Sequence, residues 1–120
     1  ACDMPSRRWN KPSIMLTCEA NYSNAHGTPW VYSHQKLGKL VGMPVPGTMT
    51  SVSWERLQDT SLVFGIPVIG YRLPDGNYLE NTQLEPDIKV ANDPEAIVKG
   101  EDTQLKTAVE ELLKELDENK

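Results

Sequence analysis

The sequence is poor in cysteine, in clustered positive charge and in long apolar runs. Its two cysteines, Cys2 and Cys18, are too few for a disulfide scaffold or a structural zinc site, and they either pair or remain lone thiols. No apolar run reaches the ~20 residues that a membrane span needs. The net charge is -5, and the longest basic run is Arg7-Arg8. Nucleic acids and anionic membranes are therefore poor candidates as partners.

The chain also lacks the common motifs of nucleotide and metal chemistry. It has no glycine-rich phosphate loop, no HExxH and no CxxC, so no cofactor and no metal site is predicted. Cys18, His26 and His34 could be gathered as a metal set, but they are scattered and lack the short-range spacing of metal-ligand motifs.

What is present fits one globular domain with a modest core. The 120 residues are enough for one domain and too few for two of ordinary size. Hydrophobic residues make up 38%, and three Trp and four Tyr need burial, which argues against disorder throughout. Residues 1–12, polar and interrupted by proline, are predicted to be an arm or loop, and residues 13–120 the folded portion.

The first half of the chain predicts a βαβ unit. Residues 13–19 form a short apolar run typical of a buried strand, and residues 21–28 are turn formers that predict a loop. Pro29 suits the first position of a helix, which Gly38 can end, and residues 39–43 follow as a second strand. Such a unit places its two strands parallel, with a right-handed crossover.

The second half predicts shorter elements and one long helix. Residues 49–54 alternate weakly and suggest a strand, and residues 62–73 are the most apolar stretch. The turn formers at 74–77 predict a hairpin into 78–79, and residues 87–90 a last short strand. A short helix is expected between Asp93 and Gly100.

The clearest element is an amphipathic C-terminal helix with Asp102 or Thr103 as its cap and Glu residues on its outer face. Packing of this helix on its own domain is favoured over binding to a partner. Its apolar stripe recurs at helical spacing and consists of Leu105, Ala108, Val109, Leu112, Leu113 and Leu116.

Two polar residues stand where a site could form. Ser23 lies between a predicted strand and helix, where a nucleophile can meet backbone N–H groups, although a serine there is more often a turn former or cap. A Ser23/His26 pair lies in a loop that fixes no geometry, and no orienting carboxylate is evident. Glu80, just past the hairpin strand, is by default an exposed rim carboxylate.

Three segments, in order, resemble the tail-specific (C-terminal-processing) and tricorn-type serine peptidases and together cover roughly residues 12–117. The first is similar to the region of the family's nucleophile, the second to its "ENxGxEPDIxV" segment and the third to the opening of its last helix. They are residues 21–29 with 37–47, residues 78–90 and residues 99–109.

The resemblance implies a crotonase-like α/β partial domain that hydrolyses peptide bonds through an acyl-enzyme. Ser23 would be the nucleophile and the Asn24 backbone N–H an oxyanion donor. In the Ser/Lys members a lysine stands where this chain has Thr48, so that version does not fit. In the tricorn version a Ser-His pair from earlier in the chain acts with a glutamate, whose position Glu80 occupies.

The chain also departs from the family pattern. The residues after the nucleophile are usually small or acidic, and here they are Asn24-Ala25-His26. The histidine base, its serine partner and a second oxyanion donor would precede residue 1. We therefore expect a C-terminal portion of a protease domain, inactive alone, produced by truncation or proteolysis.

The expected partners are a peptide or unfolded protein substrate and the missing N-terminal part, with a homo-oligomer left open. The compartment is undetermined, with the bacterial periplasm or cell envelope slightly favoured over the cytoplasm. The alternative is a non-catalytic peptide-binding module in which Ser23 is a turn former. A Ser-His dipeptide upstream of residue 1 would favour the enzyme.

Overall fold

The computed structural model describes residue 9 and residues 11–118, so most of the predicted arm at 1–12 lies outside the described residues. Five strands and three helices follow one another along this part of the chain. In order they are β1 (Ile14–Thr17), α1 (Asn24–His34), β2 (Lys39–Gly42), β3 (Ser51–Arg56), β4 (Val63–Ile69), β5 (Ile88–Lys89), α2 (Pro94–Val98) and α3 (Thr103–Glu118).

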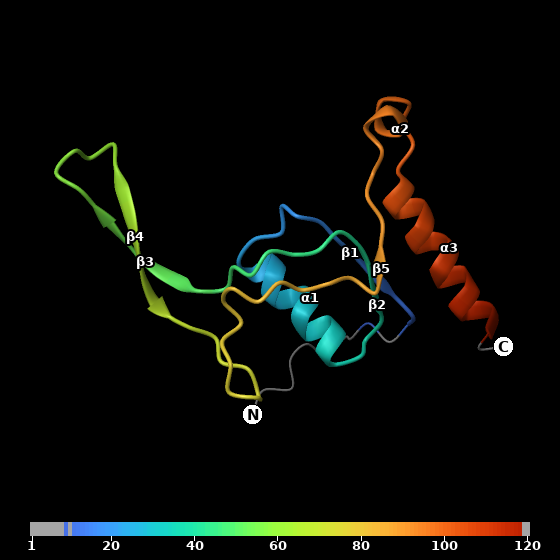
Figure 1. Ribbon diagram of the computed structural model, residues 1–120, viewed down its shortest axis with the longest axis horizontal. Coiled ribbons are helices and arrows are strands. Elements are labelled where there is room, and N and C mark those ends of the chain that lie inside the picture. Colours follow the sequence, from blue (N-terminus) through green and yellow to red (C-terminus); the bar gives the residue numbers. More distant parts are fainter. Residues whose placement is uncertain (1–8, 10, 119–120) are drawn as a thin grey trace.

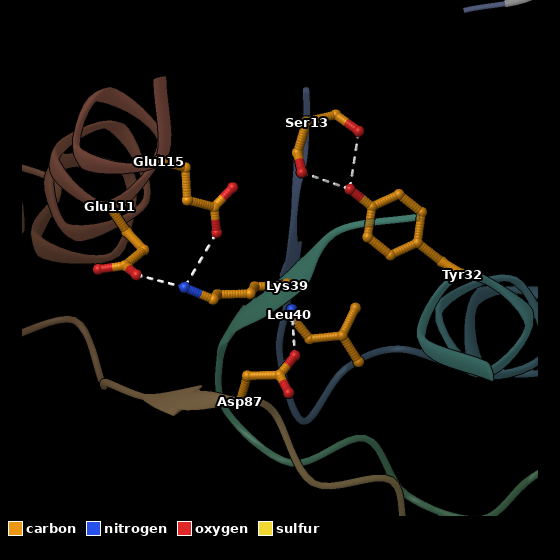
Figure 2. Close-up of polar contacts among 7 residues, drawn as sticks. All are labelled: Ser13, Tyr32, Lys39, Leu40, Asp87, Glu111 and Glu115. Carbon is orange, nitrogen blue, oxygen red and sulfur yellow. Dashed lines mark hydrogen bonds and ion pairs between the residues drawn. The ribbon is translucent and has the colours of Figure 1, made fainter. Parts of the chain in front are cut away.

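A three-stranded parallel sheet forms the body, in the order β1-β2-β5. Ile14 of β1 is paired with Lys39 of β2, and Val41 of β2 with Ile88 of β5. The predicted βαβ unit and small α/β arrangement are thus confirmed, since α1 links two parallel strands. Helices α1 and α3 lie on opposite sides of this sheet (Figures 1 and 2). A sheet with both faces covered buries its central strand.

The core is small and centred on β2. Leu40 and Val41 are 1% and 0% exposed, and the loop that follows β2 adds Val45 and Met49. Leu79, which follows the 74–77 turn, packs into the same core. The core therefore joins β2 to the two loops that carry the candidate site.

Helix α3 is tied to the sheet by charge as well as by packing. The Lys39 ammonium group on β2 forms ion pairs with Glu111 and with Glu115, the latter at 3.0 Å (Figure 2). These carboxylates raise the pKa of Lys39. The prediction that the Glu residues of this helix occupy its outer face is therefore wrong for these two, which point toward β2.

The ends of β1 and β2 are fixed by two further contacts. The Tyr32 hydroxyl on α1 donates to the Ser13 carbonyl at 2.6 Å, just before β1 (Figure 2). The Leu40 N–H donates to Asp87 Oδ2 at 2.7 Å, at the start of β5 (Figure 2). Both contacts link segments far apart in the sequence.

Helix α1 begins at Asn24, five residues before the predicted start at Pro29. A proline inside a helix leaves the carbonyl four residues earlier without its donor. Here that carbonyl belongs to Ala25, and the Asn21 side-chain amide donates to it at 2.8 Å. This replacement bond allows Pro29 to lie inside the helix, so the predicted loop at 21–28 is wrong beyond Ser23.

The apolar stretch 62–73 pairs differently from the prediction. The predicted hairpin around the 74–77 turn is present in a short form, with an isolated antiparallel bridge between Arg72 and Tyr78 and a hydrogen bond from the Leu79 N–H to the Tyr71 carbonyl at 3.0 Å. Most of the apolar stretch instead forms β4, which pairs antiparallel with β3. We call residues 51–69 the ribbon; it projects from the body (Figure 1).

The C-terminal elements match their predicted caps. Asp93 caps α2, and Gly100 (φ 82°) follows it in the conformation that favours glycine. Asp102 accepts the Leu105 N–H at 2.9 Å at the start of α3. The α3 stripe packs only in part, because Leu105 is 50% exposed and Leu113 56% exposed. None of the helices described here is long and apolar enough to cross a membrane.

Candidate active site

Ser23 is the N-cap residue of α1 and has an unusual backbone conformation. Its φ of 54° and ψ of -117° lie in a region that residues with a β-carbon rarely adopt. Its side chain makes no capping hydrogen bond to the helix. Conformations of this kind cost about 1–3 kcal/mol and gather at functional sites. The hydroxyl is therefore not used as an ordinary cap.

Ser23 lies between a strand and a helix, as predicted, but not directly at the end of the strand. Strand β1 ends at Thr17, and a short loop leads from there to α1. Asn21 organises this loop, because its Oδ1 accepts the Cys18 N–H at 3.2 Å and the Cys18 thiol at 3.3 Å. Cys18 is a free thiol, whereas Cys2 lies outside the described residues. Asn21 was not predicted as a site residue, although its position four residues before Ala25 was an available signal.

The Asn24 backbone N–H is available to a ligand. Asn24 is exposed, it opens α1, and the described part of the chain offers its N–H no hydrogen-bond acceptor. The first N–H groups of a helix have no partner within the helix and point outward. This geometry suits a donor to a negatively charged oxygen next to Ser23.

Glu80 is held by a neighbouring loop. Its Oε2 accepts the Met49 N–H at 2.6 Å and the Thr50 hydroxyl at 2.8 Å. These two donors hold the pKa of the Glu80 carboxyl below its usual value, so the group is a carboxylate at neutral pH. The Thr50 backbone N–H also lowers this pKa, and the hydrogen bonds from Met49 N–H and the Thr50 hydroxyl engage Oε2 rather than Oε1.

The loops of residues 47–50 and 80–82 lie against each other. The Asn81 N–H donates to the Gly47 carbonyl at 2.8 Å, and Asn81 has a positive φ of 60°. A β-carbon at Gly47 would come within 2.3 Å of the Thr82 backbone nitrogen, so only glycine allows this approach. The approach fixes Glu80 relative to Met49 and Thr50.

Ser23 and Glu80, 57 positions apart in the sequence, line one cavity of about 140 Å³. Thr48 lies between them, and its Oγ1 accepts the Ser23 N–H at 3.3 Å. The remaining lining comes from the neighbouring loops and from the base of the ribbon, and consists of Tyr22, Met49, Thr50, Val52 and Pro67. From the sequence, Thr48 was noted only as the position where the Ser/Lys members have a lysine, and Thr50 was not predicted.

Asn24 lines a larger, mostly apolar cavity of about 560 Å³. Met49 lines both cavities, so they lie next to each other. The lining comes mainly from α1 and from the chain around the 74–77 turn, and includes Gly27, Trp30, Val31, Tyr71, Leu73 and Leu79. Arg72 is its one cationic lining residue among those described.

The two histidines do not join Ser23. His26 is 0% exposed, and neither ring nitrogen finds a hydrogen-bond partner among the described residues, Ser23 included. Burial lowers the pKa of His26, against the opposing influence of the Thr48 backbone and the Glu80 charge. His34 stacks on Trp30 with ring centroids 4.6 Å apart. Residues 9 and 11–118 contain no cluster of three metal-ligating side chains.

A protein-family comparison identifies the family of the chain. The family model described as Peptidase family S41 matches residues 3–90, which is most of the chain. The chain belongs to peptidase family S41. Within this family it resembles the tricorn-like, C-terminal-processing peptidases, as the three sequence segments indicated.

Two curated relatives and one solved structure support this assignment. A Sulfurisphaera tokodaii protein named as a tricorn-like protease C-terminal subunit is 31% identical over 97% of this chain and 14% of its own length. The tricorn protease of Thermoplasma acidophilum is 27% identical over 86% of this chain and 10% of its own. A crystal structure of the tricorn protease superposes with a TM-score of 0.76 at 25% identity, covering 87% of this chain and 10% of that one.

These relatives are much longer than this S41 chain. It spans about one seventh of the S. tokodaii protein and one tenth of the T. acidophilum tricorn protease. The comparison therefore shows the family, the S41 type of fold and a protease-related function. The roles of individual residues go beyond it.

Proposed function

We propose that this chain is the nucleophile-bearing portion of a serine endopeptidase. The observation that carries the proposal is the conformation of Ser23, a strained N-cap residue whose side chain does not cap its helix, in one cavity with the carboxylate of Glu80. A serine that served only as a turn former or cap would use its hydroxyl on the helix. Membership of family S41 supports the same reaction class.

In this proposal Ser23 Oγ attacks the carbonyl carbon of the scissile peptide bond. The hydroxyl proton passes to a general base, and the carbonyl oxygen gains the negative charge of a tetrahedral intermediate. The Asn24 N–H donates to that oxygen. Breaking the C–N bond releases an amine, which takes a proton from the base, and leaves an acyl-enzyme on Ser23. Water then hydrolyses the acyl-enzyme.

Glu80 acts on the base rather than on the substrate. With Oε2 engaged by Met49 and Thr50, Oε1 remains to accept a hydrogen bond from the serine of a Ser-His pair. That pair and a second oxyanion donor lie outside residues 1–120 in this proposal. Residues 1–120 then form part of one crotonase-like catalytic domain, and the chain alone is inactive because a serine without a base is a weak nucleophile.

The substrate class we propose is a peptide or an unfolded protein segment. The apolar cavity beside Asn24 is close enough to the proposed oxyanion donor to take a side chain next to the scissile bond. The small cavity holds the reacting groups, and its polar lining residues include Ser23, Thr50 and Glu80. Homo-oligomer formation remains a proposal drawn from the family resemblance.

A fluorophosphonate probe tests this function. We expect the intact peptidase, which contains this chain and the base, to be labelled at Ser23 and to lose labelling and peptidase activity in the Ser23→Ala variant. The 120-residue chain alone should not be labelled. Labelling of the intact protein elsewhere than Ser23 would overturn the nucleophile assignment. Labelling of the isolated chain at Ser23 would overturn the need for a base outside it.

A further inference from the structure

Three successive residues hold both ends of the candidate site. Thr48 Oγ1 accepts the N–H of Ser23, and the next two residues donate to Glu80 Oε2. We call residues 48–50 the bracket. Because the bracket residues are adjacent in the chain, a displacement of one contact changes the spacing between Ser23 and Glu80.

Ser23 needs an external hold on its backbone. Its φ and ψ are unfavourable, and such a conformation persists only where the surroundings fix it. The Ser23 carbonyl accepts N–H groups of His26 and Gly27, which are ordinary first-turn helix bonds. Among the described residues, the Ser23 N–H has Thr48 Oγ1 as its one acceptor. Rotation of Ser23 out of its strained conformation would therefore break the bond to Thr48.

The bracket is itself anchored on two sides. The Thr48 N–H donates to the Pro46 carbonyl at 3.0 Å, and Gly47 accepts the Asn81 N–H. Val45 and Leu84 exchange backbone hydrogen bonds at 2.9 and 3.0 Å just before the bracket. Thr48 thus acts from a fixed backbone.

His26 makes a third contact with the bracket. His26, fully buried on the first turn of α1, lies against the backbones of Thr48 and Thr82. It is buried without a hydrogen bond to either ring nitrogen from the described residues, so it fills space between α1 and the two loops. His26 therefore packs the first turn of α1, which follows Ser23, against the bracket.

We propose that Thr48 is a positioning residue whose hydroxyl holds the backbone of the nucleophile in its strained conformation, at a spacing from Glu80 that the bracket sets. The proposal rests on the proposed function only for its effect on activity. The Ser23–Thr48 bond itself can be measured without activity.

The test compares Thr48→Val, which keeps the branched shape and removes the hydroxyl, with Thr48→Ser, which keeps the hydroxyl. In the intact peptidase we expect Thr48→Val to lower kcat about 10- to 100-fold, the scale reported for misplaced reacting groups, with KM within about twofold. Thr48→Ser should restore kcat to within about threefold of the parent. Thr60→Val, in the exposed ribbon turn, is the matched control and should leave both constants unchanged.

A second measurement uses the amide of Ser23 in the 120-residue chain. In the parent and in Thr48→Ser, its proton should exchange slowly and show the weak temperature dependence of a hydrogen-bonded amide; in Thr48→Val that protection should be lost. A freely exchanging Ser23 amide in the parent chain would overturn the proposal even if Thr48→Val failed to fold. Unchanged kcat in a folded Thr48→Val enzyme would also overturn it.

Failure of the proposed function would look different. A Ser23→Ala enzyme with normal activity would refute the nucleophile, whereas protection of the Ser23 amide would still show whether Thr48 holds that backbone. Loss of activity in Ser23→Ala together with an unchanged kcat in Thr48→Val would refute only the positioning role of Thr48.

Discussion

The parallel-sheet body and the ribbon use apolar residues in opposite ways. Strand β2 contains only Leu40 and Val41 as large apolar residues, and both are almost fully buried. Strand β4 is nearly all apolar, yet Phe64 and Val68 are each 58% exposed. Burial here follows position rather than apolarity, because β2 lies between two strands and two helices.

The two regions also differ in how their loops are held. The body loops carry the bonds that fix Ser23 and Glu80, whereas the ribbon joins the body at its base, where the Ser51 and Tyr71 hydroxyls lie 3.0 Å apart. A two-stranded hairpin without further cover is marginally stable in water. We therefore expect the body to determine catalysis and stability, and the ribbon to tolerate substitution.

The largest effect should come from Glu80→Gln in the intact peptidase. This change keeps the shape but removes the negative charge that orients the base, so kcat should fall on the order of 10² to 10⁴. Stability should also fall modestly, because Oε2 accepts its hydrogen bonds from Met49 and Thr50 as a charged group. Steady-state kinetics on a short peptide measure the effect.

The ribbon provides the control for that experiment. Phe64→Ser removes an exposed side chain far along the ribbon from the cavity, and kcat on a short peptide should stay within about twofold. Near-normal kcat in Glu80→Gln would contradict the role of Glu80, and Ser23 would then need another source of activation. An equal loss in Phe64→Ser would contradict the division between body and ribbon.

A pair of glycines sharpens the same comparison through stability. Gly47→Ala places a β-carbon against the Thr82 backbone, which cannot move without separating the loops, and should lower the free energy of unfolding by about 1–3 kcal/mol. In the ribbon, a β-carbon at Gly65 would meet the Trp54 ring at 3.1 Å, and an exposed side chain can give way. Gly65→Ala should therefore change the free energy of unfolding by less than about 0.5 kcal/mol. Urea unfolding of the 120-residue chain measures both changes. Equal losses of stability in the two variants would contradict the division between body and ribbon.

Much of the body could be predicted from local sequence. The βαβ order and the amphipathic spacing of α3 depend on local patterns, and both were predicted. The start of α1 was not, because it depends on a side-chain bond from Asn21 to Ala25 that replaces the donor missing at Pro29. Hydrophobic periodicity and turn-forming residues do not predict such a side-chain hydrogen bond.

The candidate site could be predicted in its main residues only through the family resemblance. Ser23 and Glu80 line one cavity, but physical reasoning alone favoured a turn former and a rim carboxylate. Thr48, Thr50 and His26 could not be assigned, since the residues that they lie against are 22 to 56 positions away in the sequence. The predicted strand at 49–54 is confirmed by β3, but its pairing with β4 was not predicted, because apolarity does not say which of two neighbouring segments will pair.

The smallest effect concerns pH and separates the two histidines. Burial holds the pKa of His26 in the folded chain below its usual 6.5. At a pH between the lowered pKa and 6.5, the unfolded chain therefore binds more protons than the folded chain. The contribution of neutral His26 to the free energy of unfolding is therefore fully present above about pH 6.5. It falls as the pH drops below 6.5, by at most about 1.4 kcal/mol per pH unit for one proton. Glu80, the charged group beside His26, opposes this shift without reversing it. Its own lowered pKa contributes stability that is lost only at lower pH, as the carboxylate protonates.

Urea unfolding of the 120-residue chain between pH 7.5 and 5.5 measures this slope. We expect His26→Gln to flatten it, because glutamine does not titrate, whatever the variant does to stability at pH 7.5. His34→Gln is the matched control, since His34 is exposed on α1 and its loss should leave the slope as in the parent. A parent slope that survives in His26→Gln and vanishes in His34→Gln would show that His26 is not kept neutral beneath Ser23. Such a result would mean that water or a charge enters the space between α1 and the bracket, in contradiction to the buried position of His26.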